Sequence, residues 1–334
     1  MSLAWLLLQF ALCAVLIARA GYMLSVSADA LAQAYGWGRG WVGLALLATV
    51  TSLPELASGI SAVALVDAPN LAVGNALGAC VINLLFLVVV DALQRGQPLY
   101  REASATHLLS AGFGVVMLGF VALSLLTGSR APAVLHVGIY SPMLLVLYLL
   151  ALKGVHDHER RALAPKAGGP EPAPAGSKRQ EWRRFGLAAL VVLAAGSWLP
   201  QVADGLATAL GLSRSFVGTV LMALVTTLPE MAVTLGALRL GALDMALGNL
   251  LGSNLFNIMI LAVDDAFYVR GPLLAAVAPV HAGTAVTALV MTGLVIIGLV
   301  MRPQGRTLRL VSWISVGLAA TYVVNAALVF LGEA

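Results

Sequence analysis

The sequence predicts an all-α polytopic membrane protein. Its ten transmembrane helices are expected to form two inverted five-helix repeats with broken helices at the midplane. Of the 334 residues, 60% are apolar and only 10% are charged, which is too little charge to cover the surface of a soluble protein of this size. Apolar stretches of about twenty residues, the length that crosses a bilayer as a helix, recur along the chain. One motif also occurs once in each half.

The expected spans follow these apolar stretches in order. The first stretch lacks a preceding basic segment, so it is interpreted as a span rather than a cleaved signal. Spans two and seven contain a repeated Pro-Glu motif, and spans three and eight contain a Gly-Asn motif. The remaining spans are continuous apolar stretches. We place the ten spans near residues 3–26, 38–64, 70–92, 105–127, 132–152, 185–208, 214–238, 243–265, 273–300 and 308–331.

A polar stretch at residues 153–184 divides the chain into a first repeat, 1–152, and a second repeat, 185–334. Its prolines, glycines and basic residues predict a flexible linker. Placing this linker in the cytoplasm puts fifteen of the nineteen Lys and Arg residues on that side and three on the other, as the positive-inside rule expects. The chain is then expected in the cell (inner) membrane with both termini outside. Because each half has five spans, the second half would enter the membrane inverted.

The internal repeat can be read directly in the sequence. "GLALLATVTSLPELA" at residues 43–57 matches "GTVLMALVTTLPEMA" at residues 218–232. With one gap, "LAVGNALGACVINLLFLVVVDA" at 71–92 matches "MALGNLLGSNLFNIMILAVDDA" at 245–266. The two motif regions therefore cover residues 43–92 and 218–266. Inverted repeats are typical of secondary transporters, whose substrate site lies near the midplane where the repeats meet.

Glu55 and Glu230 are the acidic residues expected well inside apolar spans. The other thirteen are expected in loops, near span ends or at the terminus, and no Lys or Arg is expected at the depth of the two glutamates. An ionised carboxylate in hydrocarbon is costly, so each should face a cavity, carry a proton or hold a cation. If the two glutamates face each other, a cation between them relieves their repulsion.

Other oxygen atoms are expected around these glutamates. Pro54 and Pro229 lack an N–H and should break their helices, which frees the carbonyl oxygens four residues earlier. The hydroxyls beside the breaks either add ligands or hydrogen-bond back to the preceding turn, and the next span of each repeat supplies an amide. The set comprises the side chains of Thr51, Ser52, Thr226, Thr227, Asn83 and Asn257. Such oxygens suit Ca²⁺ and Na⁺ rather than zinc or copper.

Both motif regions resemble the alpha repeats of the sodium/calcium exchanger family, within the calcium/cation antiporter superfamily. The family's usual forms are Gly-Thr-Ser-Leu-Pro-Glu and Gly-Asn-x-x-Gly-Ser-Asn-x-x-Asn or Asp. The resemblance implies antiport of Ca²⁺ for Na⁺ by alternating access, with no cofactor. It implies that Ca²⁺ binds Glu55, Glu230 and the backbone carbonyls of Thr51 and Thr226. Na⁺ would share the glutamates and use the carbonyls of Ala48 and Ala223 and the hydroxyls of Ser52, Thr227 and Ser253.

The sequence departs from the family pattern at several positions. Val50 and Val225 replace the glycine that begins the family's Gly-Thr-Ser-Leu-Pro-Glu motif. Ala79 replaces a serine whose counterpart Ser253 is kept, and Asn257 stands where many prokaryotic relatives have Asp. These changes suggest either fewer bound Na⁺ ions or coupling to protons. The dedicated proton/calcium branch usually carries Gly-Asn-x-x-Glu, which favours the sodium branch here.

Several functions remain as alternatives at this point. A proton-coupled Ca²⁺/cation antiporter would use the same pocket, with H⁺ as the counter-ion. A cation channel would repeat its motifs around a symmetry axis rather than in two inverted halves. An intramembrane enzyme would need a His, Ser-Lys or metal cluster at membrane depth, which the sequence does not suggest, so we predict that the protein is not an enzyme. The lipid bilayer is the expected partner, and neither a nucleic acid nor a protein partner is implied.

Overall fold

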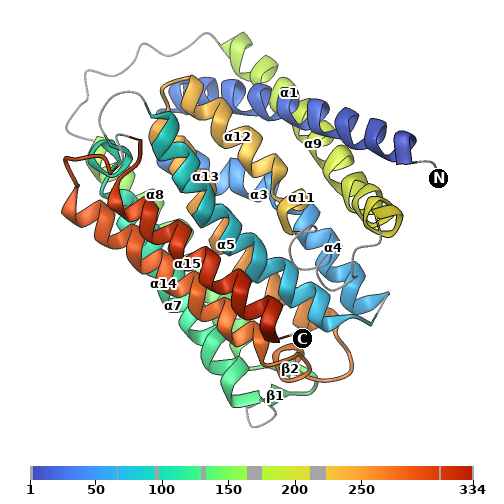
Figure 1. Ribbon diagram of the computed structural model, residues 1–334. Helices are drawn as coiled ribbons and strands as arrows, with labels where there is room; N and C mark the ends of the chain where they lie inside the picture. Colours follow the sequence, from blue (N-terminus) through green and yellow to red (C-terminus); the bar gives the residue numbers. More distant parts are fainter. Residues whose placement is uncertain are drawn as a thin grey trace.

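The computed structural model describes residues 3–65, 67–94, 98–128, 133–163, 175–210, 223–307 and 310–332, and these residues are mainly helical (Figure 1). The first half contains α1 (Leu3–Tyr35), α2 (Arg39–Val42), the π-helical turn η1 (Gly43–Leu47), α3 (Ala48–Thr51), α4 (Leu53–Ala64), α5 (Pro69–Leu93), α6 (Leu99–Glu102), α7 (Thr106–Thr127), β1 (Ala133–Val134), β2 (Val137–Gly138) and α8 (Tyr140–Leu163). The second half contains α9 (Ala175–Leu210), α11 (Ala223–Thr226), α12 (Leu228–Arg239), α13 (Leu243–Phe267), the 3-10 turn η5 (Leu273–Ala275), α14 (Val280–Met301) and α15 (Trp313–Gly332).

The described helices have the lengths and compositions of membrane spans. Five of them, α1, α5, α7, α13 and α14, are long and apolar enough to cross a bilayer, and the bent segment from α2 to α4 is a sixth candidate. Large apolar side chains on the outer helices face away from the protein, among them Leu8 and Leu12 on α1 and Leu190 on α9. Such a continuous apolar exterior is suited to lipid rather than water. The chain is therefore a membrane protein.

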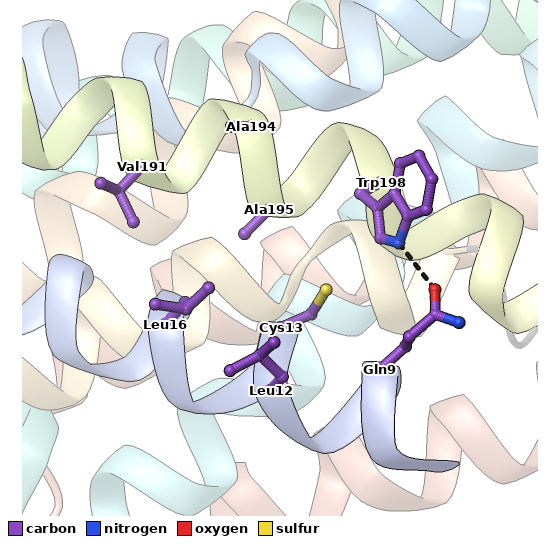
Figure 2. Close-up of a pocket in the computed structure, with 8 residues that line it drawn as sticks. All are labelled: Gln9, Leu12, Cys13, Leu16, Val191, Ala194, Ala195 and Trp198. Carbon is purple, nitrogen blue, oxygen red and sulfur yellow. Dashed lines mark hydrogen bonds between the residues drawn. The ribbon is translucent and has the colours of Figure 1, made fainter. Parts of the chain in front are cut away.

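The central helix of the fold is α13. Most of it is buried, and it contacts α4, α5, α7, α8 and η1. On the outside of the fold, α1 runs along α9 and α12 (Figure 1). An apolar groove of about 470 Å³ lies between α1 and α9 and is lined by Leu12, Cys13 and Val191. Trp198 Nε1 donates a hydrogen bond of 3.1 Å to Gln9 Oε1 at one end of this groove (Figure 2).

Three pairs of helices recur with equal lengths in the two halves. α4 and α12 have 12 residues each, α5 and α13 have 25, and α7 and α14 have 22. α13 begins 174 residues after α5, and α14 begins 174 residues after α7. The repeat found in the sequence therefore corresponds to a repeated order of helices.

A buried aspartate near the end of α5 and another near the end of α13 hold the turns that follow these helices. Asp91 accepts hydrogen bonds from Leu99 N at 3.1 Å and from Ser312 N at 2.6 Å. Asp265 accepts one from Leu273 N at 2.7 Å and another from Gly138 N at 2.8 Å. Each aspartate thus accepts a hydrogen bond from the N–H eight residues later and another from an N–H in the other half of the chain. Buried carboxylates with several donors are satisfied structural groups.

Several predicted boundaries were wrong. The span predicted at 132–152 is a β1–β2 hairpin followed by α8, which continues to Leu163. The linker predicted at 153–184 is helical at both ends, because α9 already begins at Ala175. The polar residues beyond the apolar stretches are good helix formers, so the helices extend past the expected membrane boundary. Residues 164–174, in the middle of the predicted linker, lie outside the described part of the chain, as does the start of the span predicted at 214–238.

The last two spans also begin later than predicted. The span predicted at 273–300 consists of η5 and then α14 from Val280, and the span predicted at 308–331 begins at Trp313. In both cases a short polar or turn segment binds a buried aspartate before the long helix starts. These hydrogen bonds favour a turn over a continuous helix at the membrane boundary.

Candidate functional site

The two predicted helix breaks are confirmed. α3 ends at Thr51 and α4 begins at Leu53, and the segments on either side of the break are bent by 42°. The residue between them, Ser52, has φ −91° and ψ 7°, and its counterpart Thr227 between α11 and α12 has φ −82° and ψ −1°. A proline in the first turn of α4 and of α12 removes the N–H that would continue the helical hydrogen-bond ladder.

The backbone carbonyls expected to bind Na⁺ accept hydrogen bonds at the two breaks. The carbonyl of Ala48 accepts a hydrogen bond of 3.0 Å from Ser52 N, and that of Ala223 accepts one of 3.1 Å from Thr227 N. The carbonyls expected for Na⁺ therefore each have one lone pair engaged.

Glu55 and Glu230 are both buried, with 1% and 0% of their surface exposed. Ser52 Oγ of the first half donates a hydrogen bond of 2.7 Å to Glu230 Oε1 of the second half. Thr226 lies beside Glu55, and Ser253 lies beside Glu230. Side chains from the two halves therefore lie close together beside the two glutamates.

Of the four hydroxyls beside the breaks, that of Ser52 donates a hydrogen bond to a glutamate side chain. The other three hydrogen-bond to a backbone carbonyl or to an asparagine. Thr51 Oγ1 donates to the Leu47 carbonyl at 3.0 Å, and Thr227 Oγ1 donates to the Ala223 carbonyl at 2.9 Å. These are the back-bonds to the preceding turn that were the alternative interpretation of these residues. Thr226 Oγ1 lies 3.3 Å from Asn75 Oδ1. Each hydroxyl oxygen still has lone pairs with which it can accept a cation.

Several buried oxygens on the broken helices, on α5 and on α13 have no hydrogen-bond partner among the described residues. Such atoms are rare in folded proteins and usually mark a missing ligand or water. Asn83 donates to Asn254 Oδ1 at 3.2 Å, but its own oxygen is unpartnered. The unpartnered oxygens include those of Glu55 (both), Glu230 (Oε2), Asn83, Asn249, Ser253 and Asn257. All are hard donors that suit Ca²⁺ or Na⁺.

Two asparagines that sequence reasoning did not single out also support the pocket. Asn249 Nδ2 donates to the Glu230 carbonyl at 3.2 Å and to Thr234 Oγ1 at 3.0 Å. Asn75 Nδ2 donates to Ser58 Oγ at 3.0 Å, and Ser58 Oγ donates to the Glu55 carbonyl at 3.0 Å. Both asparagines therefore reach the first turn after the break, directly or through one hydroxyl. The sequence signal that could have identified these two asparagines is the Gly-Asn pair that occurs in both repeats.

Close helix packing brings these groups together. A Cβ atom at Gly252 would lie 2.6 Å from Leu44 Cα, 2.7 Å from Leu44 O and 2.9 Å from Ala48 Cβ. At Gly252, one residue before Ser253, α13 therefore lies directly against the backbone of η1 and the Ala48 side chain of α3. Ala79 is completely buried at the position that the repeat pairs with Ser253, so the first half has no hydroxyl there.

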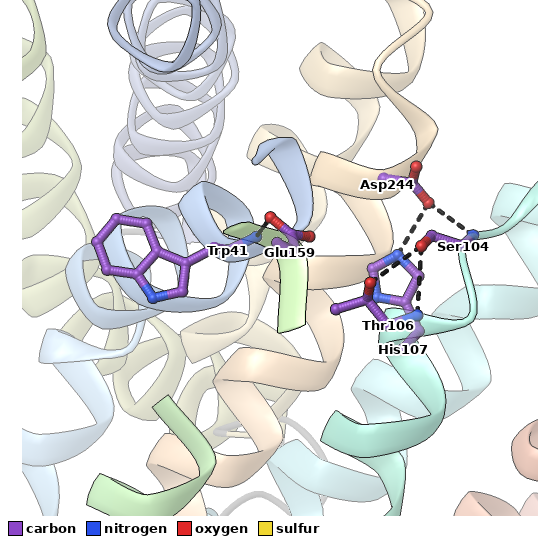
Figure 3. A network of polar contacts seen from close by, with 6 residues as sticks. All are labelled: Trp41, Ser104, Thr106, His107, Glu159 and Asp244. Atoms are coloured by element: carbon purple, nitrogen blue, oxygen red, sulfur yellow. Dashed lines mark hydrogen bonds and ion pairs between the residues drawn. The ribbon is translucent and has the colours of Figure 1, made fainter. Parts of the chain in front are cut away.

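A separate polar network lies at the start of α13. Asp244 Oδ1 is 3.0 Å from His107 Nε2 and accepts a hydrogen bond of 2.9 Å from Ser104 N (Figure 3). Glu159 Oε2 accepts one of 3.0 Å from Trp41 N. His107 is therefore a satisfied structural histidine, as expected from the sequence. Among the described residues no three His, Cys, Asp or Glu side chains gather as a metal cluster, so a cation in the central pocket would rely on two glutamates and neutral oxygens.

The chain was compared with known proteins. Residues 5–152 and 182–331 match the profile of the family described as sodium/calcium exchanger protein. CaxA of Alkalimonas amylolytica, named as a proposed antiporter, is 32% identical over 223 residues, covering 65% of this chain and 66% of the relative. The inner membrane protein YrbG of Escherichia coli (strain K12) is 29% identical over 248 residues, covering 71% and 72%. A solved structure of the sodium-calcium exchanger NCX_Mj, soaked with Na⁺ and Sr²⁺, has a TM-score of 0.76 at 20% identity and covers 98% of this chain and 99% of the other.

Proposed function

The chain belongs to the sodium/calcium exchanger family, and on this premise we propose that it is a secondary active antiporter that exchanges Ca²⁺ for Na⁺ by alternating access. The two ions compete for one midplane site built on Glu55 and Glu230. The observation that carries this proposal is the group of buried, unpartnered oxygens around the two glutamates. A cation would satisfy these oxygens and balance the two negative charges together.

The ligand sets differ for the two ions. Ca²⁺ takes about six to eight oxygens, and the two glutamates with the carbonyls of Thr51 and Thr226 supply its core. Na⁺ shares the glutamates and adds the hydroxyls of Ser52, Thr227 and Ser253. The Na⁺ set is completed by the carbonyls of Ala48 and Ala223, and the amide oxygens of Asn83 and Asn257 are available to either ion. Because the sets overlap, one ion leaves before the other is bound.

The charge of the pocket accounts for obligatory exchange. With no cation bound, two buried carboxylates face each other in a low-dielectric site, and closing the protein around them is unfavourable. A bound Ca²⁺ or a set of Na⁺ ions removes this penalty, so only loaded states change their access. The first and sixth spans, α1 and α9, are the candidates for sliding, because neither carries a central ligand.

The membrane arrangement forms part of the proposal. Ten spans in two inverted halves are supported by the equal lengths of α4 and α12, α5 and α13, and α7 and α14. They are also supported by the matching roles of Asp91 and Asp265. The distribution of basic residues supports a cytoplasmic linker and outward-facing termini, and the name of the relative YrbG supports the inner membrane.

A proton-coupled exchanger that uses the same pocket is the second candidate. It is favoured by one observation: Ala79 leaves the first half without the hydroxyl that Ser253 supplies in the second. Fewer Na⁺ ligands would weaken Na⁺ binding, and a proton on Glu55 or Glu230 would then serve as the counter-ion.

The test is radiolabelled Ca²⁺ uptake into proteoliposomes that contain the purified protein. Vesicles loaded with Na⁺ are compared with choline-loaded vesicles and with vesicles under a proton gradient. Uptake should require internal Na⁺ and should be lost in Glu55→Gln and Glu230→Gln. The control Asp67→Asn changes an exposed carboxylate paired with Arg270 and should retain uptake. Uptake driven by the proton gradient alone would favour the second candidate, and uptake that survives both Gln substitutions would refute the assigned site.

A further inference from the structure

A third carboxylate lies buried outside the glutamate pocket. Asp264, on α13, has 0% of its surface exposed, and neither of its oxygens has a hydrogen-bond partner among the described residues. The next residue, Asp265, is equally buried but accepts hydrogen bonds from Gly138 N, Tyr140 Oη, Ser141 Oγ and Leu273 N. Asp265 is a structural group, whereas Asp264 has no structural role that its contacts reveal.

The side chain of Asp264 lies against the backbone of α4. A Cβ atom at Gly59 would come within 2.7 Å of Asp264 Oδ1 and 2.9 Å of its Cγ. Gly59 follows Glu55 by four residues, which is about one helical turn. Asp264 follows Asn257 by seven residues, or about 10 Å along the helix axis. The carboxylate therefore lies beyond the central pocket, toward the C-terminal ends of α4 and α13.

Asp264 has no counterpart in the other half. The sequence repeat pairs Asp264 with Val90, and it pairs Gly59 with Thr234. One half thus supplies a valine and the other a carboxylate, and the glycine that accommodates this carboxylate is replaced by a larger residue in the other repeat. The acidic group is an addition to the repeated architecture, which distinguishes it from the paired glutamates and the paired structural aspartates.

The surroundings of Asp264 favour a proton over a metal ion. Ca²⁺ requires about six to eight oxygens, and Na⁺ likewise needs several. The hydroxyl nearest along α4, that of Ser58, already bonds the Glu55 carbonyl and Asn75. The other charged groups on the two packed helices are Glu55 on α4 and Asp244 and Asp265 on α13. All three are acidic, and no described basic residue forms an ion pair with Asp264. An ionised carboxylate is unfavourable there, whereas a single proton neutralises it without further ligands.

We propose that Asp264 is a proton-binding site, distinct from the Glu55–Glu230 pocket, which is protonated while α4 packs against α13. Its role in transport rests on the proposed exchange function. Gly59 and Glu55 belong to the same 12-residue helix α4. A local shift of α4 when Glu55 exchanges its cation, separate from the sliding proposed for α1 and α9, would move the Gly59 backbone away from Asp264. Water could then reach the carboxyl group and take its proton, which links proton movement to the exchange of cations.

Infrared spectroscopy of the protein in lipid vesicles at pH 7 tests the protonation directly. A protonated carboxyl group gives a carbonyl band that an ionised carboxylate lacks. We expect this band in the wild type and in the Asp67→Asn control, and its loss in Asp264→Asn. Asp264→Val, which introduces the residue of the other repeat, provides a second variant should the asparagine disturb the fold. An unchanged band in both Asp264 variants would overturn the proposal.

A second measurement tests the link to transport and separates it from the proposed function. Proteoliposomes that contain a pH-sensitive dye report proton movement while radiolabelled Ca²⁺ uptake is followed. We expect proton movement during uptake in the wild type and in Asp67→Asn, and its loss in Asp264→Asn. Equal proton movement per Ca²⁺ in Asp264→Asn would refute the link, and a changed Na⁺ requirement would identify Asp264 as a Na⁺ ligand instead. If the wild type shows the infrared band but no Ca²⁺ uptake, the proposed function fails while the proton site stands.

Discussion

The substitution Gly252→Ala tests whether backbone contact between α13 and the broken helix sets the geometry of the pocket. The added Cβ would lie 2.6 Å from Leu44 Cα and 2.7 Å from Leu44 O, whereas ordinary van der Waals contact begins near 3.4 Å. The two backbones must therefore separate by about 0.8 Å, because neither contacted atom is a flexible side-chain end. Overpacking of this kind costs about 1–3 kcal/mol.

The expected effect on transport exceeds the effect on stability. Ser253 follows Gly252 directly, and Ala48 is one of the residues that the new Cβ would contact, so the separation moves two groups of the proposed Na⁺ site apart. A displacement of about 1 Å in a site of fixed geometry costs up to about a hundredfold in rate. We therefore expect Na⁺-driven Ca²⁺ uptake to fall by about tenfold or more. The melting temperature should fall by about 2–6 °C.

The matched control is Gly293→Ala on α14. A Cβ at that position has no atom within 4 Å, so the same chemical change adds no crowding there. Both variants are purified in detergent for thermal melting and reconstituted for radiolabelled Ca²⁺ uptake. If Gly252→Ala and Gly293→Ala transport at the same rate, the backbone contact does not set the pocket geometry, and the reasoning is refuted.

Three further predictions concern single polar groups. Ala79→Ser should restore the hydroxyl that the first half lacks and raise the apparent Na⁺ affinity by about fivefold, or about 1 kcal/mol; an unchanged Na⁺ dependence of uptake would contradict it. Ser52→Ala removes the 2.7 Å hydrogen bond to Glu230 and a proposed Na⁺ ligand. The Na⁺ concentration for half-maximal uptake should therefore rise more than the corresponding Ca²⁺ concentration. Equal shifts would count against a Na⁺-specific role. Asp265→Asn places an amide N–H among four donors and should destabilise the protein by about 2–4 kcal/mol. Its melting temperature should be lower than that of Asp67→Asn. Equal melting temperatures would contradict the structural role of Asp265.

The features that depend on local covalent chemistry could be predicted from the sequence. Pro54 lacks an N–H wherever it is placed, so the break before α4 follows from the residue itself, and the repeated motif locates the second break in the same way. The ends of α8 and α9 could not be predicted, because hydropathy marks where apolar residues stop and not where the helix stops. Helix-forming polar residues continue both helices beyond that point.

Contacts between the two halves were beyond sequence reasoning. Nothing in the motif shows that Ser52 of one half bonds Glu230 of the other while Thr51 bonds its own preceding turn. Both are hydroxyl residues beside the same break, and helix rotation decides which one faces the pocket. Asp264 was missed for a related reason: its position near the end of a span suggested exposure, and only the absence of a side chain at Gly59 allows it to be enclosed.

The groove between α1 and α9 has a practical consequence for spectroscopy and labelling. The sequence has two cysteines: Cys13 lines this groove, whereas Cys80 is completely enclosed and its Sγ lies 3.7 Å from the Asn254 carbonyl. The chain therefore carries one thiol in the groove between α1 and α9 and one thiol in its interior. A lipid-soluble thiol reagent should react faster with Cys13 than with Cys80. The reaction rate at Cys13 would then report on the accessibility of the groove between α1 and α9 without any engineered residue.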